Sequence, residues 1–260
     1  MTYKLLFLDV DGTVFKPDHT YSNTTKQAIA ALQNKGVTVF FATGRALHEL
    51  HELAEELDIE SFIVYNGAFA SHRGDIIVDE PFTRDAIEQF LSIAEHNDHE
   101  LMLYTKEQNY CTNLDHPFVQ RFIDTFGLTK NAAFTPDIMD SVLGITVLNA
   151  TEPNAHLYEI NANYHVSPVH VKGAECSYDV LRSNVNKGRS IETILERFNI
   201  APEEAIAFGD GMNDKEMLQT VGEGFAMGNA SNDLFAYAKH RTTTVNDDGI
   251  ARGLEKLGLL

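Results

Sequence analysis

Short apolar runs followed by amphipathic helical stretches recur at both ends of this 260-residue chain, and this rhythm constrains its fold more than any other feature. Residues 4–8, 37–42 and 62–65 read as buried strands, and residues 205–208 repeat the pattern near the C-terminus. Strands that alternate with helices form βαβ units, whose parallel sheet is covered on both faces. The helices expected between them cover residues 23–34 with Ser22 as N-cap, a leucine face at Leu47, Leu50, Leu53 and Leu57, and residues 191–198, 217–221 and 250–257.

The middle of the chain follows a different pattern. Short alternating runs indicate strands at residues 101–105, 108–112 and 142–148, and the residues on either side of Gly173 indicate a hairpin. Helices are expected at residues 118–126 and 152–164. Hairpin strands mixed with helices are typical of an α+β domain with an antiparallel sheet. We therefore expect a parallel α/β core, residues 1–81 and 187–260, that is split in sequence by an inserted domain at residues 82–186.

The charge balance excludes several classes of partner. With 38 acidic and 20 basic residues, the formal net charge is −18. Such a surface repels phosphate backbones and anionic lipid heads, so we expect no nucleic-acid or membrane partner. The N-terminal segment lacks a signal-peptide pattern, and no run approaches the roughly 20 apolar residues that span a bilayer. The spacing of Cys111 and Cys176 fits neither a zinc site nor a redox pair, so we expect a cytoplasmic protein.

Polar side chains follow three of the expected strands at the strand end, which is where open parallel sheets bind ligands. They are Asp9 and Asp11, then Thr43-Gly44-Arg45, then Asp210 and Asp214. Residues two apart on an extended backbone point the same way, so Asp9 and Asp11 are expected to face one pocket. Carboxylates held together repel unless a cation neutralises them. Mg²⁺ fits this set, because it prefers oxygen ligands and accepts a phosphate oxygen as well.

The same region offers groups that could bind an anion. Lys187 opens an expected helix and could balance the carboxylates and a phosphate together. Thr43 and Gly44 offer a hydroxyl and a backbone N–H at the start of a helix, where anions bind favourably. An anionic substrate would need such a local cation in a chain this acidic.

From Lys4 to the C-terminal helix, the chain resembles the haloacid dehalogenase-like hydrolase superfamily. The motifs that carry the resemblance are, in chain order, Asp9-Val10-Asp11-Gly12-Thr13, Thr43, Lys187, and Gly209-Asp210 with Asp214. The insertion after the second motif, and the form Gly-Asp-Gly-Met-Asn-Asp at residues 209–214, are similar to the Cof-type sugar-phosphatase branch with a large α/β cap of type IIB. The resemblance implies a Rossmann-like core, Mg²⁺ dependence and phosphate-ester hydrolysis.

The resemblance also implies a role for each matching residue. Asp9 would be the nucleophile that forms an aspartyl-phosphate, and Asp11 would be the general acid and base. The Mg²⁺ ligands would be Asp9, the backbone carbonyl of Asp11, and Asp210, with Asp214 as a second-shell or water-mediated partner. The substrate phosphoryl group would be bound by Thr43, Gly44, Lys187 and Asn213.

Other features leave the substrate and part of the function open. Arg182 stands where this branch often has proline before the motif lysine, and His165 and His170 lie near the expected hinge as candidate substrate contacts. The leading interpretation is a Mg²⁺-dependent phosphatase for a small phosphorylated metabolite. A phosphotransferase or phosphomutase on the same core, and a non-catalytic phosphate sensor, are the alternatives. The oligomeric state is not encoded in any pattern found here.

Overall fold

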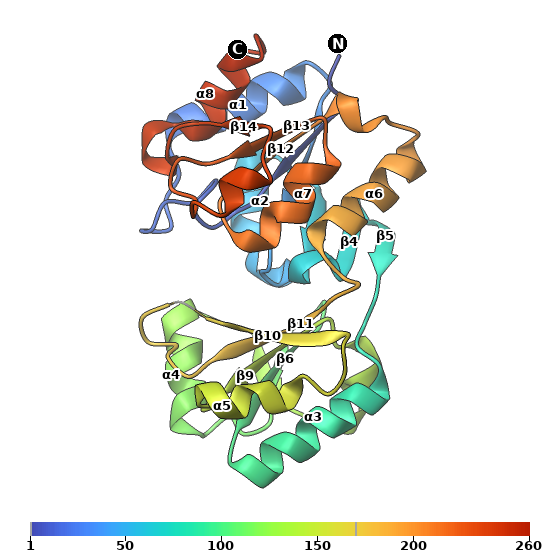
Figure 1. The fold of residues 1–260 in the computed structure, drawn as a ribbon, viewed down its shortest axis with the longest axis vertical. Helices are drawn as coiled ribbons and strands as arrows, with labels where there is room; N and C mark the ends of the chain where they lie inside the picture. Colours follow the sequence, from blue (N-terminus) through green and yellow to red (C-terminus); the bar gives the residue numbers. More distant parts are fainter. Residues whose placement is uncertain (1, 170) are drawn as a thin grey trace. The chain divides into compact units, whose positions relative to one another are not determined.

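The computed structural model describes residues 2–169 and 171–260, and its strands form two separate sheets (Figure 1). The chain divides into two compact units. The first holds the N-terminal segment up to Arg45, residues 50–79 and residues 186–260. The second holds residues 80–185 and the short segment 46–49. The sequence prediction of an α/β fold with a parallel core sheet and a second, smaller sheet is confirmed.

The sheet of the first unit has eight strands in the order β14-β13-β12-β1-β2-β3-β4-β5. Neighbours from β14 to β3 pair in parallel, and β3, β4 and β5 pair antiparallel. The bounds are β1 (Leu5–Leu8), β2 (Thr38–Ala42), β3 (Ser61–Val64), β4 (Phe69–His72), β5 (Asp75–Asp79), β12 (Ala205–Gly209), β13 (Glu223–Ala226) and β14 (His240–Arg241). The sequence patterns missed the hairpin β4–β5, because its edge strand alternates weakly and is mostly exposed.

Helices cover both faces of this sheet. Leu5 and Phe7 of β1 pack in one core with α6 (Lys187–Phe198) and α7 (Lys215–Thr220). On the opposite face α8 (Gly249–Lys256) lies so close that a Cβ on Gly253 would come within 2.4 Å of the Phe208 ring. The helix α1 (Asn23–Asn34) packs beside α8, and its expected N-cap is present, since the Ser22 hydroxyl accepts from the Thr25 N–H at 3.0 Å.

The expected leucine-faced helix is broken in the structure. A 3₁₀ turn covers Leu47–Glu49, and α2 begins only at His51 and ends at Leu57. Leu50, Leu53 and Leu57 are buried, as expected for residues on one face that packs against the core. Leu47 is only half-buried and lies in the separate turn.

The second unit contains a six-stranded sheet in the order β10-β11-β9-β6-β7-β8. All its neighbours pair antiparallel except β7 and β8, which pair in parallel. One face packs on α3 (Arg84–Asn97) through Leu101 and Leu103, and the other on α4 (Pro117–Phe126) through Met102. The bounds are β6 (Glu100–Tyr104), β7 (Asn109–Cys111), β8 (Asn131–Ala133), β9 (Gly144–Leu148), β10 (Tyr164–Pro168) and β11 (Tyr178–Arg182).

The helix expected at residues 152–164 is wrong in its second half. The helix α5 covers only Glu152–Ala155, a 3₁₀ turn follows, and Tyr164 already opens β10. The side chain of Asn161 accepts from the N–H of Asn163 at 2.9 Å, which is an Asx turn and competes with helix. Pairing of Tyr164 with β11 then replaces the helical contacts that its spacing suggested.

The sequence led us to expect no membrane-spanning segment and no paired cysteines. Among the described residues, no helix is long and apolar enough to cross a membrane. Both cysteines are free thiols: Cys111 is buried, which raises its pKa to about 12, and Cys176 is exposed.

The strand order of the first sheet creates a place for a ligand. From β1 the chain continues to β2 on one side, while β12, which lies on the other side of β1, continues to β13. In open parallel sheets, ligands bind at the carboxyl ends of the strands where the direction of winding changes, which here are the ends of β1 and β12.

Candidate functional site

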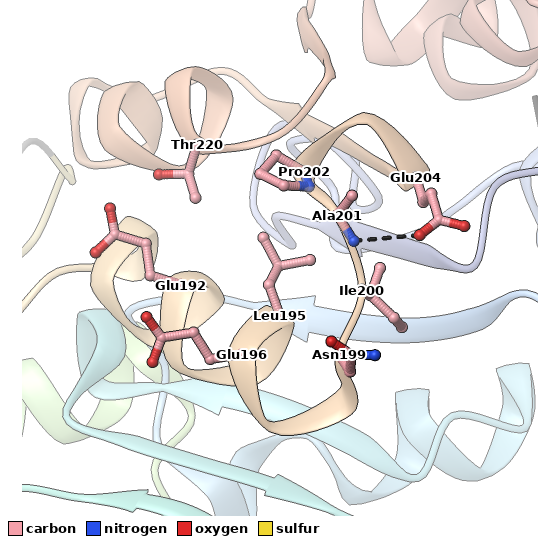
Figure 2. A pocket seen from close by; sticks show the side chains of 9 residues that line it. All are labelled: Glu192, Leu195, Glu196, Asn199, Ile200, Ala201, Pro202, Glu204 and Thr220. Atoms are coloured by element: carbon pink, nitrogen blue, oxygen red, sulfur yellow. Dashed lines mark hydrogen bonds between the residues drawn. The ribbon is translucent and has the colours of Figure 1, made fainter.

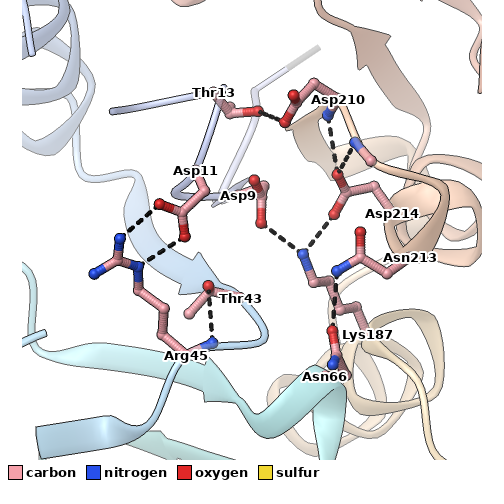
Figure 3. Close-up of polar contacts among 11 residues, drawn as sticks. Asp9, Asp11, Thr13, Thr43, Arg45, Asn66, Lys187, Asp210, Asn213 and Asp214 are labelled. Atoms are coloured by element: carbon pink, nitrogen blue, oxygen red, sulfur yellow. Dashed lines mark hydrogen bonds and ion pairs between the residues drawn. The ribbon is translucent and has the colours of Figure 1, made fainter. Parts of the chain in front are cut away.

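The carboxyl ends of β1, β2 and β12 bring together the polar residues that the sequence placed there (Figure 3). Asp9 follows β1, Thr43 follows β2, and Asp210 follows β12. Lys187 joins them as the first residue of α6. Asp9 is 6% exposed, Thr43 is 2% exposed and Lys187 has no exposed surface, so this polar cluster is largely withdrawn from water.

Lys187 is the centre of the cluster. Its Nζ donates to Asp9 Oδ1 at 2.6 Å and to Asp214 Oδ1 at 2.6 Å. Burial alone would lower the pKa of Lys187, but the charges of Asp214 and Asp9 outweigh burial and hold it above its usual value. Lys187 is therefore a permanent cation inside the site.

Asp214 organises the loop after β12. It is fully buried, and its Oδ2 accepts from the backbone N–H groups of Asp210 at 2.9 Å and Gly211 at 3.0 Å. A Cβ on Gly209 would lie 2.5 Å from this carboxylate, so only glycine leaves room for it. Both oxygens of Asp214 are thus engaged by the protein itself.

Asp210 is held by side chains from distant parts of the chain. Thr13 donates its hydroxyl to Asp210 Oδ1 at 3.1 Å, and Asn229 donates its amide to Oδ2 at 3.1 Å. Gly12 has φ +82°, and a Cβ there would lie 2.1 Å from Asp210 Oδ2, so both its conformation and its contact require glycine. Burial, followed by the charge of Asp214, raises the pKa of Asp210 to about 6.

Three of these carboxylates could hold a metal ion. Asp9, Asp210 and Asp214 each offer an oxygen, and the three oxygens lie within 4.8 Å of one another. Burial, followed by the charge of Asp214, raises the pKa of Asp9 well above its usual value even though Lys187 opposes the shift. The set carries more negative charge than one lysine balances, and its hard oxygen atoms are the donors that divalent cations such as Mg²⁺ prefer. The residues therefore fit a divalent cation.

Asp11 has a different partner from Asp9. Arg45 donates to both oxygens of the Asp11 carboxylate, with Nε at 2.7 Å from Oδ2 and Nη2 at 2.6 Å from Oδ1 (Figure 3). The side chain of Asp11 is 52% exposed. The Arg45 guanidinium also lies over the Phe15 ring, 5.5 Å from its centroid. Asp9 and Asp11 therefore have different side-chain partners, Lys187 for the first and Arg45 for the second.

The remaining expected residues lie at the edge of the cluster. Thr43 Oγ1 accepts from the Arg45 N–H at 3.2 Å, and Gly44 is exposed next to it. Asn213 is exposed, and its side-chain amide donates to Asn66 Oδ1 at 2.9 Å.

Sequence reasoning assigned no role to three residues that hold the site together: Arg45, Asn66 and Asn229. Arg45 directly follows Thr43-Gly44, and Asn66 directly follows the β3 region, so the rule that placed the other residues also marks these two. Asn229 lies beyond the last motif in a loop, and no sequence signal marks it.

Arg182, His165 and His170 were the candidate substrate contacts in the second unit. Arg182 donates to the Pro81 carbonyl at 3.0 Å and the Leu143 carbonyl at 3.5 Å, and its guanidinium lies 4.2 Å from the centroid of the Phe82 ring. Burial lowers the pKa of Arg182 to about 10. Its contacts are therefore structural. His165 is exposed on β10, and His170 lies outside the described residues.

A separate hollow of about 520 Å³ lies elsewhere in the first unit, between α6, α7 and the loop 199–204 (Figure 2). It is lined by Glu192, Leu195, Glu196, Asn199, Ile200, Ala201, Pro202, Glu204 and Thr220. None of these side chains is basic, and three are acidic, so the hollow is unsuited to a phosphate. The Asp9–Lys187 cluster remains the candidate site.

Comparison with known proteins points the same way. A family model described as haloacid dehalogenase-like hydrolase matches residues 6–254. The Bacillus subtilis protein YkrA, which bears the name of a phosphatase, is 33% identical over 262 aligned residues that cover all of both chains. The Bacillus subtilis 5-amino-6-(5-phospho-D-ribitylamino)uracil phosphatase YitU is 28% identical, with 97% of this chain and 96% of the relative covered. The sugar phosphatase BT4131, of subclass IIB of the same superfamily, shares the fold with a TM-score of 0.84 at 24% identity, covering 99% of this chain and all of that one.

Proposed function

The chain belongs to the haloacid dehalogenase-like hydrolase family, as its motifs predicted, and we propose that it is a Mg²⁺-dependent phosphatase that hydrolyses small phosphorylated metabolites through an aspartyl-phosphate on Asp9. One observation carries this proposal. The buried carboxylate of Asp9 lies at the carboxyl end of β1, 2.6 Å from the buried cation Lys187 and beside two further carboxylates. A nucleophile, a cation for the phosphoryl oxygens and a set of metal ligands thus meet at one point.

Mg²⁺ would be held by Asp9, Asp210 and the backbone carbonyl of Asp11. When bound, the ion supplies positive charge that balances these carboxylates and the phosphoryl oxygens. Asp214 has both oxygens engaged by Lys187 and by backbone N–H groups, so its proposed role is to position Lys187 and the Asp210 loop.

Asp9 acts as the nucleophile. One of its carboxylate oxygens attacks phosphorus, and the bond from phosphorus to the leaving oxygen breaks. Lys187 stabilises the negative charge that spreads over the phosphoryl oxygens during this transfer. In the second step water attacks the same phosphorus, phosphate leaves, and the Asp9 carboxylate is restored.

Asp11 carries the proton in both steps. It donates a proton to the leaving alkoxide and then accepts one from the attacking water. The bidentate contact with Arg45 holds both carboxylate oxygens of Asp11 in place between these steps. In the first step Asp11 has to turn one oxygen from Arg45 towards the leaving oxygen.

The phosphoryl group is bound by the hydroxyl of Thr43, the backbone N–H of Gly44, the ammonium of Lys187 and the amide of Asn213. The second unit is proposed to be the cap domain, which sets the choice of substrate. YitU is named for a phosphorylated ribitylaminouracil, which supports a small phosphorylated metabolite as the substrate here.

The test is phosphate release from an aryl phosphate and from a panel of phosphorylated metabolites, with Mg²⁺ and with excess chelator. We expect turnover that disappears with chelator and returns with Mg²⁺. Asp9→Asn, which keeps the size of the side chain, is the control that should be inactive throughout. Turnover that persists in chelator would contradict the metal role, and activity of Asp9→Asn would contradict the nucleophile. Transfer of the phosphoryl group to an added sugar, without release of phosphate, would instead identify a phosphotransferase.

A further inference from the structure

The turn Tyr65–Gly67, directly after β3, has an unusual backbone. Its three residues have φ values of +52°, +54° and +103° in succession. Glycine adopts this left-handed region readily and asparagine tolerates it, but tyrosine rarely enters it. Such a run persists only where surrounding contacts hold it, and runs of this kind gather at functional sites.

The contacts that hold the turn come from two elements of the proposed phosphate site. The first two N–H groups of the turn donate to carbonyls of the Thr43–Arg45 loop, at 3.2 and 3.1 Å. On the other side, the buried hydroxyl of Ser190 in α6 donates to the Gly67 carbonyl at 2.7 Å. A Cβ on Gly67 would lie 2.4 Å from the carbonyl oxygen of Asn186, the N-cap of α6. The turn therefore ties the Thr43–Arg45 loop to the helix that begins with Lys187.

The side chain of Asn66 extends this connection to a third element. Its amide lies over Gly44, since a Cβ built on Gly44 would be 3.2 Å from both Oδ1 and Nδ2 of Asn66. Its Oδ1 accepts from Nδ2 of Asn213, in the loop after β12, at 2.9 Å (Figure 3). Asn66 is thus in contact with two of the residues proposed to bind the phosphoryl group.

The contact between Asn66 and Asn213 fixes which end of the Asn213 amide can bind a phosphoryl oxygen. Phosphoryl oxygens accept hydrogen bonds, so Asn213 can bind them only through its NH₂ group, which has two N–H donors. Asn66 Oδ1 takes one of these donors. If the Asn213 amide turned over, two acceptor oxygens would face each other, so the contact keeps the NH₂ group in place and leaves its second N–H free to donate.

We propose that Asn66 is a positioning residue for phosphate binding: its side-chain oxygen holds the NH₂ group of Asn213 ready to donate to the phosphoryl group that the Gly44 N–H also binds. This inference rests on the proposed phosphatase function. In this proposal, the Tyr65–Gly67 turn holds the Thr43–Arg45 loop, the start of α6 and the loop after β12 in fixed positions around one phosphoryl group.

The experiment is a double-mutant cycle with Asn66→Gly, Asn213→Ala and the double variant in the full chain. Glycine suits the positive φ of residue 66, so this change removes the amide and keeps the turn. For each protein we would measure kcat and KM with p-nitrophenyl phosphate, and the dissociation constant of inorganic phosphate by calorimetry with Mg²⁺. Loss of one hydrogen bond predicts about three- to tenfold weaker phosphate binding in each single variant, with a similar rise in KM. The double variant should be no weaker than Asn213→Ala by more than about twofold, because both changes remove the same contact.

Asn199→Gly is the matched control. Asn199 also has a left-handed backbone, with φ +52°, at the exposed C-terminal end of α6. It should leave KM, kcat and phosphate binding unchanged. If the role of Asn66 were merely structural, Asn66→Gly would lower the melting temperature, and its effect on phosphate binding would not be coupled to that of Asn213→Ala.

Two results would overturn the proposal: wild-type phosphate affinity in either single variant, or losses that multiply in the double variant. Asn213→Ala tests the contact from its exposed side, so the proposal can fail even if Asn66→Gly is less stable. A wild-type protein that neither hydrolyses the aryl phosphate nor binds phosphate would instead refute the proposed function.

Discussion

Replacement of Lys187 by methionine should destabilise the first unit strongly. Methionine is similar in length and apolar, so Lys187→Met removes the buried charge with little change in volume. Lys187 has no exposed surface, and its Nζ is 2.6 Å from carboxylate oxygens of both Asp9 and Asp214. Loss of one partner of a buried ion pair costs about 3–5 kcal/mol, because the remaining charges are uncompensated. At about 2–4 °C per kcal/mol for a chain of this size, the melting temperature should fall by roughly 6–20 °C.

The cost should depend on pH in a direction fixed by the carboxylates. The pKa of Asp9 is already raised well above its usual value by burial and by Asp214, and without Lys187 it should rise further. A carboxyl with a raised pKa binds more protons in the folded state than in the unfolded state, so stability increases as pH falls. The defect of Lys187→Met should therefore be largest near pH 8 and should shrink towards pH 5.

The loss of stability in Lys187→Met can be measured by urea unfolding followed by circular dichroism, in chelator at pH 8 and at pH 5. Lys215→Met is the matched control, since the side chain of Lys215 is 41% exposed and forms a surface ion pair with Glu216 at 3.3 Å. Its cost should stay within about 0.5 kcal/mol at both pH values. If Lys187→Met cost as little as the control, or if its defect grew on acidification, the reasoning about the buried cluster would be refuted.

Two further predictions concern proton transfer and pH. Asp11→Asn should lower turnover of a sugar phosphate by about 10²–10⁴-fold, and of an aryl phosphate by less, because a phenolate needs little protonation to leave. Acid quenching should trap phosphoenzyme in Asp11→Asn with the aryl substrate and none in Asp9→Asn; equal losses on both substrates would show that the role of Asp11 is misassigned. In the second unit, burial lowers the pKa of His99, whose Nδ1 lies 3.1 Å from the Tyr158 hydroxyl. The unfolded chain therefore takes up a proton near pH 6.5 that the folded chain resists, so stability should fall as pH drops from about 7 to 5. His99→Gln should flatten this part of a plot of urea midpoint against pH, and an unchanged slope would argue against His99 as the source.

The sequence by itself determined most of the local structure. The helix α1 begins after Ser22 as expected, because an N-cap is a contact between residues three apart. The strands β1, β2, β3 and β12 lie where the apolar runs predicted them, since a strand buried on both faces needs such a run. Errors occur where distant pairing decides, as at Tyr164, which joins β11 instead of continuing a helix. The edge hairpin β4–β5 was missed for a different reason, since β5 is mostly exposed and alternates weakly.

The sequence also placed most of the clustered polar residues at the ends of their strands, because strand ends and the polar residues that follow them can be read locally. Only the tertiary structure decided how these residues pair. Thr13 reaches Asp210 across 197 positions of the chain, and Lys187 reaches Asp9 across 178. The contacts of Arg45 with Asp11 and of Asn66 with Asn213 depend on loop conformations that leave no periodic pattern. Local patterns report which backbone a segment prefers, whereas partners far apart in sequence are chosen by the three-dimensional arrangement of the loops.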